Sequence, residues 1–221
     1  MGNSSSRLSR AIYEQDVDKV KRLLASKGPS INGAGSKRIP PIIECVSSGF
    51  RRGDEEDKRR CEILKLLVQH GADLNVQCQT DSWLLGKTAA IVAAERGFVR
   101  CLQILFDSGA DLNITTPDGD TALILAASWG QADAVKYLVE HMSVSMLNHR
   151  NDEGKTALLV AASESEFDFY RCMRHLVVAG ADINVKDGEG NTALMLSVKL
   201  EQEDRVELLT EHVPAIPGSQ E

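Results

Sequence analysis

The sequence has few aromatic residues and no long apolar run. Aromatic residues make up 5% of the 221 residues, whereas apolar residues as a group make up 43%. The core must therefore be built from Ala, Leu, Ile and Val, which favours close helix stacking over a large sheet sandwich. No apolar run approaches the ~20 residues that span a bilayer, and no hydrophobic stretch after Met1 resembles a secretory signal. We therefore expect a cytoplasmic protein.

Residues with catalytic or metal-binding chemistry show no pattern. The five cysteines are scattered, odd in number and lack any C-x-x-C pair, which is typical of reduced core thiols. Three histidines, His70, His141 and His175, are expected to cap helix C-termini rather than to bind metal. The Gly-Lys-Thr triplets at 86–88 and 154–156 lack the earlier glycine of a phosphate-binding loop, and no serine lies in a G-x-S-x-G elbow. The sequence therefore predicts no enzyme, no cofactor and no metal.

Two short motifs recur along the chain. GADLN at 71–75, GADLN at 109–113 and GADIN at 180–184 each end a leucine-rich stretch, and the threonines that open the next stretches stand 33, 35 and 36 residues apart: Thr88, Thr121, Thr156 and Thr192. Such a period, with a turn and two short helices per unit, is typical of stacked repeats. Over nearly its whole length the chain resembles the ankyrin family. The resemblance implies an all-α solenoid of helix-turn-helix repeats with projecting loops, here called fingers.

The repeats are expected to form one domain at residues 8–212, between a flexible N-terminus at 1–7 and a flexible tail at 213–221. We predict about six units, of which 8–32 and 192–212 are polar terminal caps. The unit at 36–75 carries a charged insertion around 50–57, predicted as a loop. Apolar residues replace the His of the family's T-P-L-H-x-A pattern, so packing must hold these units instead of that residue's hydrogen bonds.

Charge is distributed unevenly. Residues 1–60 hold 13 Lys and Arg against 8 Asp and Glu, whereas residues 61–221 hold 12 against 24. The acidic repeats and a pI of about 5.3 disfavour nucleic acid as a partner. The two ends either face different partners or are simply solvated.

The N-terminus matches the acylation pattern M-G-x-x-x-[ST], which predicts addition of myristate to Gly2. One myristoyl chain gives only marginal membrane attachment, so a second contact is needed. In this interpretation the membrane-surface residues are Arg7, Arg10, Lys21 and Arg22. The alternative is an ordinary flexible, serine-rich start.

Ankyrin proteins bind other proteins along the concave face formed by fingers and first helices. The resemblance therefore implies binding residues at the matching positions: Glu95, Arg96, Thr115, Asp118, Asp120, Ser128, Trp129, Arg150, Asp152, Glu153, Ser163, Glu164, Lys186 and Glu189. We expect Trp129 to converge with Asp118 and Asp120, so that the face prefers an apolar side chain flanked by Lys or Arg. Alternatively, Trp129 fills a gap between repeats and the carboxylates are only solvated.

One finger, between Asn75 and Thr88, is longer than the finger at 113–121 and carries three consecutive large apolar residues, Trp83, Leu84 and Leu85. On a projecting turn these residues would be binding anchors. Alternatively, Trp83 and Leu84 fold back over the adjacent helices.

These observations favour a non-enzymatic adaptor that holds a protein partner at the cytosolic membrane surface through acylated Gly2. The alternative is a soluble inhibitor or ligase-type adaptor without a lipid anchor. An enzyme would need catalysis in an inserted loop, and the insertions at 50–60 and 163–169 contain no base and nucleophile pair.

Overall fold

The computed structural model describes residues 4–26, 31–32, 38–48, 53–80 and 83–212. All regular secondary structure in these ranges is helical, which confirms the predicted all-α class. The chain divides into two compact units, Met1–Ala122 and Leu123–Glu221, each described by itself below.

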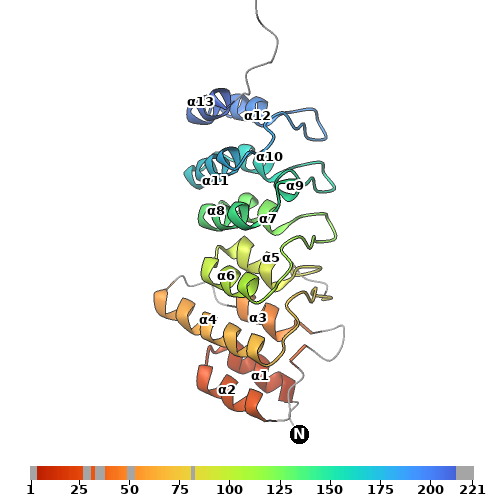
Figure 1. Ribbon diagram of the computed structural model, residues 1–221, viewed down its shortest axis with the longest axis vertical. Coiled ribbons are helices and arrows are strands. Elements are labelled where there is room, and N and C mark those ends of the chain that lie inside the picture. Colours follow the sequence, from red (N-terminus) through yellow and green to blue (C-terminus); the bar gives the residue numbers. More distant parts are fainter. Residues whose placement is uncertain (1–3, 27–30, 33–37, 49–52, 81–82, 213–221) are drawn as a thin grey trace, which may run out of the picture. The chain divides into compact units, whose positions relative to one another are not determined.

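The first unit consists of three antiparallel helix pairs. In Figure 1 the first helices of the pairs form one layer and the second helices another, and neighbours within each layer are in contact. The pairs are α1 (Ser4–Tyr13) with α2 (Val17–Ala25), α3 (Pro41–Ser47) with α4 (Asp54–Gln69), and α5 (Ala89–Arg96) with α6 (Val99–Asp107).

The second unit repeats this arrangement. Its pairs are α7 (Ala122–Ser128) with α8 (Ala132–His141), α10 (Ala157–Ala162) with α11 (Phe167–Val178), and α12 (Ala193–Lys199) with α13 (Glu203–Glu211). A short extra helix, α9 (Val144–Leu147), precedes the finger that leads into α10 and was not expected from the sequence. Figure 1 shows the fingers of this unit projecting on the side of α10 and α12.

The recurring threonine caps the N-terminus of three first helices, α5, α10 and α12. Thr88, Thr156 and Thr192 accept hydrogen bonds at Oγ1 from the backbone N–H three residues later, in each case at 3.3 Å. This satisfies one of the free N–H groups of a helix N-terminus. The predicted local role of the threonine is therefore confirmed at these positions.

The GADxN motif ties successive repeats together. Asp73 accepts a hydrogen bond at Oδ1 from the N–H of Asn75, and Asn75 Oδ1 in turn accepts one from the N–H of Asp111 in the next repeat at 2.9 Å. In the second unit Asn148 Oδ1 accepts from the N–H of Asp182 at 2.8 Å. At these two places an Asn side chain therefore holds one repeat to the next.

The core is made of small and branched aliphatic residues, as the composition predicts. The buried positions of α5 include Ile91 at the place of the family's His. At the helix ends, Nδ1 of His70 and of His141 lies 2.8 Å from the carbonyl oxygen four residues earlier. This geometry agrees with the predicted capping role of these two histidines.

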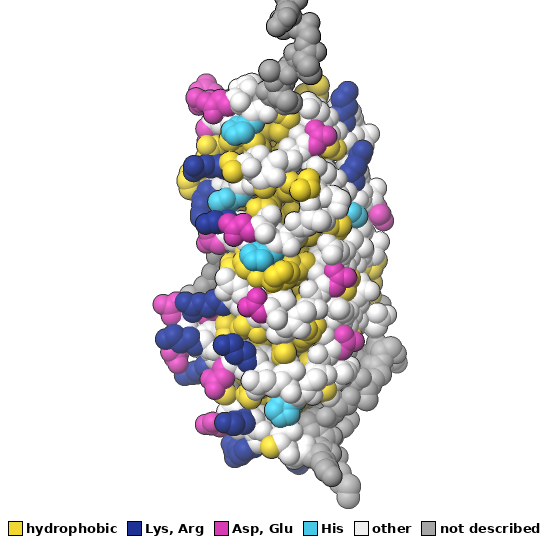
Figure 2. Space-filling view, in the orientation of Figure 1, with side chains coloured by type: hydrophobic (Ala, Val, Ile, Leu, Met, Phe, Trp, Pro, Cys, Tyr) yellow, Lys and Arg dark blue, Asp and Glu magenta, His cyan; other side chains and the backbone are white. Residues whose placement is uncertain are grey.

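One prediction about local structure is wrong and another is incomplete. The charged insertion is not a loop throughout, because α4 begins at Asp54. Four acidic residues in its first turn favour a helix N-terminus, and Figure 2 shows charged side chains of both signs over α4. The C-terminal cap has the expected polar face, because Glu201, Glu203, Asp204 and Glu207 are exposed, but Met195 and Val198 of α12 are also 49% and 57% exposed. First helices are normally covered by a following repeat, and α12 belongs to the last described pair.

Candidate protein-binding site

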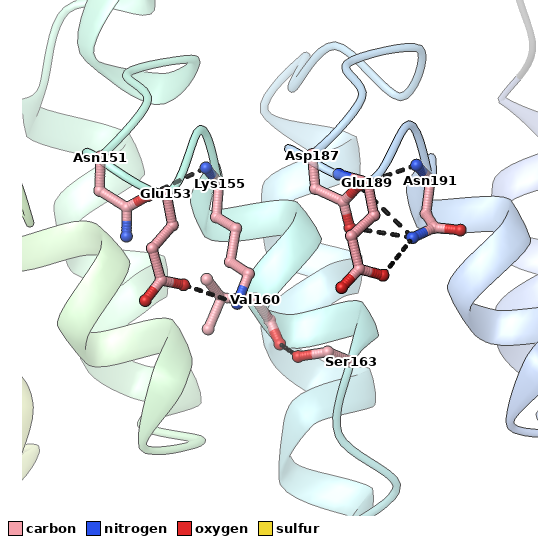
Figure 3. A network of polar contacts seen from close by, with 8 residues as sticks. All are labelled: Asn151, Glu153, Lys155, Val160, Ser163, Asp187, Glu189 and Asn191. Carbon is pink, nitrogen blue, oxygen red and sulfur yellow. Dashed lines mark hydrogen bonds and ion pairs between the residues drawn. The ribbon is translucent and has the colours of Figure 1, made fainter.

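A pocket of about 330 Å³ lies in the second unit, between two successive fingers and the first helices beneath them. Leu159 of α10 and Leu196 of α12 supply apolar lining. The fingers supply Glu153, Lys155 and the segment 187–189. Figure 3 shows the side chains of Glu153, Lys155 and Glu189 extending from the two fingers in the same direction. The pocket thus combines apolar side chains with a charged rim.

Each finger is held in shape by an Asn or Asp at its start. Asn151 accepts a hydrogen bond at Oδ1 from the N–H of Lys155 at 2.9 Å, and its own N–H donates to the Lys155 carbonyl. Asp187 has the same role in the next finger, because its Oδ1 accepts from the N–H groups of Glu189 and Asn191 at 2.9 and 2.8 Å. The rim residues therefore sit on two turns of matching construction (Figure 3).

Arg150 fixes the two fingers to each other. Its Nε donates to the carbonyl of Gly154 in its own finger, and its Nη2 donates to the carbonyl of Lys186 in the next, both at 2.9 Å. A planar guanidinium with several donors can span two backbones in this way. These two hydrogen bonds therefore fix the spacing of the two fingers, which sets the width of the pocket.

The rim is acidic overall. Glu153, Asp187 and Glu189 bring three carboxylates against the single ammonium of Lys155. The hydrogen bond between Glu153 and Lys155, at 2.7 Å, lowers the pKa of the carboxyl and raises the pKa of the amine. Backbone donation from Asn191 lowers the pKa of Asp187. Glu153 and Asp187 are therefore ionised at neutral pH.

A second exposed cluster lies in the first unit around Trp83. The ring is 49% exposed, with Arg96 Cζ at 4.8 Å and Lys87 Nζ at 5.1 Å from its centroid. These distances are those of cation–π contacts. Leu85 is also exposed, at 43%. The long finger thus presents part of its apolar sequence to solvent.

Two expectations about this cluster are wrong. Leu84 does not project, because it is 2% exposed and packs inward as the fold-back alternative requires. Glu95 is not an exposed binding position either, since only 6% of it is exposed and its Oε2 lies 2.8 Å from Lys87 Nζ. The lysine approaches from the finger and covers the carboxylate, a contact that spacing along the sequence does not indicate.

The other predicted binding residues are distributed over both units. Trp129 is 61% exposed and belongs to the second unit, whereas Asp118 and Asp120 belong to the first, so their convergence stays a prediction. Asp152 and Glu164 are exposed and Ser128 is half-buried. Three of the predicted residues, Glu153, Ser163 and Glu189, line the pocket.

Most residues that line the pocket were not predicted from the sequence. Those not singled out include Lys155, Leu159, Asp187 and Leu196. A residue-by-residue alignment of the fingers at 151–155 and 187–191 would have shown that both begin with Asn or Asp and carry Glu two residues later. Such an alignment is the signal that could have found the rim.

The predicted membrane-facing residues are only partly free. Arg7, Arg10, Lys21 and Arg22 are exposed, but Arg10 is paired with Glu14 at 2.7 Å, and Lys19 pairs with the same carboxylate. Gly2 lies outside the described residues. Within the described ranges, no helix combines the length and apolar character that a bilayer crossing requires.

The pattern of paired helices, capped threonines and projecting fingers defines a class of repeat protein, and a family model identifies it. The model for ankyrin repeats (3 copies) matches at 8–116, 55–148, 92–187 and 143–217, so the chain belongs to the ankyrin repeat family. An ankyrin repeat domain is a protein-binding fold.

Curated relatives are much longer than this chain. It is 31% identical over 83% of its length to alpha-latrocrustotoxin-Lt1a of Latrodectus tredecimguttatus. It is 32% identical over 51% to the E3 ubiquitin-protein ligase KEG of Arabidopsis thaliana and 37% identical over 48% to mouse ankyrin repeat and SOCS box protein 6. The aligned regions cover 13%, 7% and 25% of these proteins.

Solved structures match over nearly the whole chain. The ankyrin repeat protein EF0377 superposes with a TM-score of 0.77 at 25% identity, covering 94% of this chain and 98% of that one. A structure of the Bdellovibrio bacteriovorus predatory endopeptidase Bd0816 in complex with immunity protein Bd3460 gives a TM-score of 0.73 at 23% identity, covering 94% and 98%. The second likeness shows the fold alone.

Proposed function

We propose that the chain is a non-enzymatic adaptor whose second unit binds a partner protein through a basic side chain placed in the pocket between the fingers at 151–155 and 187–191. The observation that carries this proposal is the acidic rim above Leu159 and Leu196. Lys and Arg have apolar stems and charged heads, so they suit a site with apolar lining and an anionic rim. Glu153 and Glu189 are exposed, and Arg would meet them with its planar donors.

Lys155 limits where a basic side chain of the partner can bind. Its ammonium pairs with Glu153 and would repel a second cation, but the three carboxylates of the rim outweigh this single positive charge. Glu189 is engaged by one amide hydrogen bond, from Asn191 Nδ2 at 3.2 Å, which leaves acceptor positions for a guest. We expect an apolar residue beside the basic one, because the lining is apolar on both helices.

A peptide selection tests the binding site. Peptides selected from a display library against the unmodified protein should be enriched in Lys or Arg next to an apolar residue. Their affinity should fall about tenfold or more, as fluorescence anisotropy reports, in the Glu153→Gln/Glu189→Gln double variant. The matched control is Glu203→Gln/Glu207→Gln, which removes the same charge from exposed positions of α13. Equal loss in both variants, or selected peptides without basic residues, would contradict the proposal.

The finer proposal is that myristate on Gly2 tethers the adaptor to a membrane, supported by the N-terminal pattern and the exposed Arg7, Lys21 and Arg22. Intact mass from eukaryotic cells tests acylation, and Gly2→Ala should move the protein to the soluble fraction. Equal partition of both forms would favour the soluble alternative. A ligase-type adaptor is supported by the likeness to KEG and to ankyrin repeat and SOCS box protein 6.

A further inference from the structure

Two buried cysteines and a carboxylate meet between the second helices of consecutive repeats in the first unit. Asp57 and Cys61 lie four residues apart on α4 and therefore share one face of the helix. Cys101 on α6 brings its Sγ to 3.9 Å from Cys61 Sγ. The ligand atoms of the three residues all lie within 4.8 Å of one another. Figure 1 shows α4 and α6 side by side.

The separation of the sulfur atoms suits a bridging metal ion. Tetrahedral coordination with Zn–S bonds of about 2.3 Å places two sulfur atoms about 3.8 Å apart. The observed 3.9 Å is within about 0.1 Å of that value. A disulfide would require the sulfur atoms to approach to about 2.0 Å, which demands a movement of the helices or of both side chains.

The surroundings balance the charge of such a site. Two thiolates and a carboxylate carry three negative charges, and a divalent cation leaves one. Arg100 Nη1 lies 3.4 Å from Asp57 Oδ2, and Arg60 Nη1 lies 3.7 Å from Oδ1. Both contacts are long, so the carboxylate keeps acceptor positions for a metal. The Arg60 guanidinium is held over the Phe98 ring at 3.9 Å and acts as a fixed outer charge.

The site is enclosed but reachable. Cys101 is fully buried and Cys61 is 9% exposed, while the Asp57 side chain is 25% exposed. Asp57, Arg60 and Arg100 also line a cleft of about 270 Å³. An ion can therefore enter from the side of Asp57, and a water molecule in the cleft can complete the coordination.

We propose that Asp57, Cys61 and Cys101 form a binding site for a soft divalent cation of the Zn²⁺ type, with a fourth position left for water. Thiolate ligands select such ions over Mg²⁺ or Ca²⁺. Binding replaces the two thiol protons, which pass to the buffer as the two metal–sulfur bonds form. The ion would link α4 to α6 and so join two consecutive repeats. Spacing along the sequence does not indicate this site, because the cysteines are 40 residues apart.

Metal titration of the reduced full chain tests the proposal. Zn²⁺ should bind one ion per chain in competition with a chromogenic chelator, and Co²⁺ should give a thiolate-to-metal charge-transfer band. Zn²⁺ should also raise the thermal midpoint, because the three ligands are brought together only in the folded state. Cys61→Ser and Cys101→Ser should each weaken binding by more than the roughly 100-fold typical of an outer-shell loss, and Asp57→Asn by roughly 10-fold or more.

The control is Cys172→Ser, which makes the same chemical change at a buried cysteine of the second unit. Each variant is first checked by circular dichroism, and Cys101→Ala replaces Cys101→Ser if the hydroxyl is not tolerated. A loss of affinity restricted to changes at residues 57, 61 and 101 supports the site. Failure of the reduced protein to take up Zn²⁺, equal uptake by Cys61→Ser, or equal loss in Cys172→Ser would overturn it.

Discussion

Lys87 of the long finger and Glu95 of α5 form a buried ion pair. Their side chains are 13% and 7% exposed, and Nζ lies 2.8 Å from Oε2. Breaking a buried ion pair by removing one partner leaves an unpaired charge, which costs more than the pair contributes. Lys87 therefore holds the long finger against α5 and does not serve as a contact for an external ligand.

We predict that Glu95→Gln lowers the free energy of unfolding by about 3 kcal/mol, measured by urea denaturation. Replacing both partners, as Lys87→Met/Glu95→Leu, should recover most of the loss. Glu153→Gln serves as the control, because the Lys155–Glu153 pair is 41% and 69% exposed and should contribute under about 1 kcal/mol. Equal losses of unfolding free energy in Glu95→Gln and Glu153→Gln would show that burial does not determine how much these ion pairs contribute to stability.

Asp187 makes the stability of its finger depend on pH. Backbone N–H groups of Asn191 and Glu189 hold the pKa of Asp187 below its ordinary value of 3.8. A carboxyl whose pKa is lowered on folding contributes stability above its unfolded pKa and loses it as the pH falls through the folded pKa. Asn151 occupies the equivalent place in the preceding finger, so an amide is compatible with the turn.

We therefore predict that Asp187→Asn is less stable than the unmodified protein at pH 7, and that the difference shrinks below pH 3.8. Urea midpoints measured from neutral to acidic pH check this. The reverse exchange, Asn151→Asp, should introduce a similar pH dependence. A stability difference that stays constant into acid would mean that the charge of Asp187 does not matter.

At the scale of elements, neighbouring fingers of the first unit pack through a glycine. Gly86 has a φ of +68°, and a Cβ at this position would lie 2.2 Å from Cδ of Pro117. Gln77 joins the same two fingers, because its Nε2 donates to the carbonyls of Gly86 and Thr115 at 2.8 and 2.9 Å. Glycine is therefore required at position 86 both by the positive φ and by the close approach of Pro117.

Comparison of two glycine substitutions separates these requirements. Gly71 has a φ of +82°, and a Cβ added there would have no neighbour within 4 Å, so Gly71→Ala should cost only the left-handed backbone strain of about 1–2 kcal/mol. Gly86→Ala adds the collision with Pro117 and should cost clearly more. Urea denaturation of both variants measures the difference. Similar losses would show that the finger at 116–120 moves aside freely.

The helices and turns were predictable because their signals are local. Thr caps and left-handed glycines lie within a few residues of the contacts they make, so α5, α10 and α12 follow from the sequence. Contacts between repeats were not predictable in the same way. Lys87 with Glu95, Arg150 with Lys186 and Cys61 with Cys101 depend on how elements meet in space. The pocket depends on contacts of this second kind, so Glu153 and Glu189 of its rim were anticipated as exposed positions but not as parts of one site.

At the scale of the whole molecule, stability should be distributed by unit. In repeat proteins each repeat contacts mainly its neighbours, so stability is approximately a sum of repeat and nearest-neighbour contributions. The chain has two tryptophans, Trp83 and Trp129, and the compact units contain one each. Both rings are partly exposed, and Trp83 contacts two cations. Their fluorescence can therefore report on the two units independently.

Single-tryptophan variants, Trp129→Phe to observe Trp83 and Trp83→Phe to observe Trp129, make this testable. In these backgrounds Gly86→Ala should lower the urea midpoint reported by Trp83 more than the midpoint reported by Trp129. Thr156→Ala removes the cap of α10, worth about 1 kcal/mol, and should have the opposite preference. Because nearest-neighbour coupling falls off along a repeat array, each substitution should lower the urea midpoint most in its own unit. If both substitutions shift both signals equally, the chain unfolds as one cooperative body, and the assignment of stability to separate units is wrong.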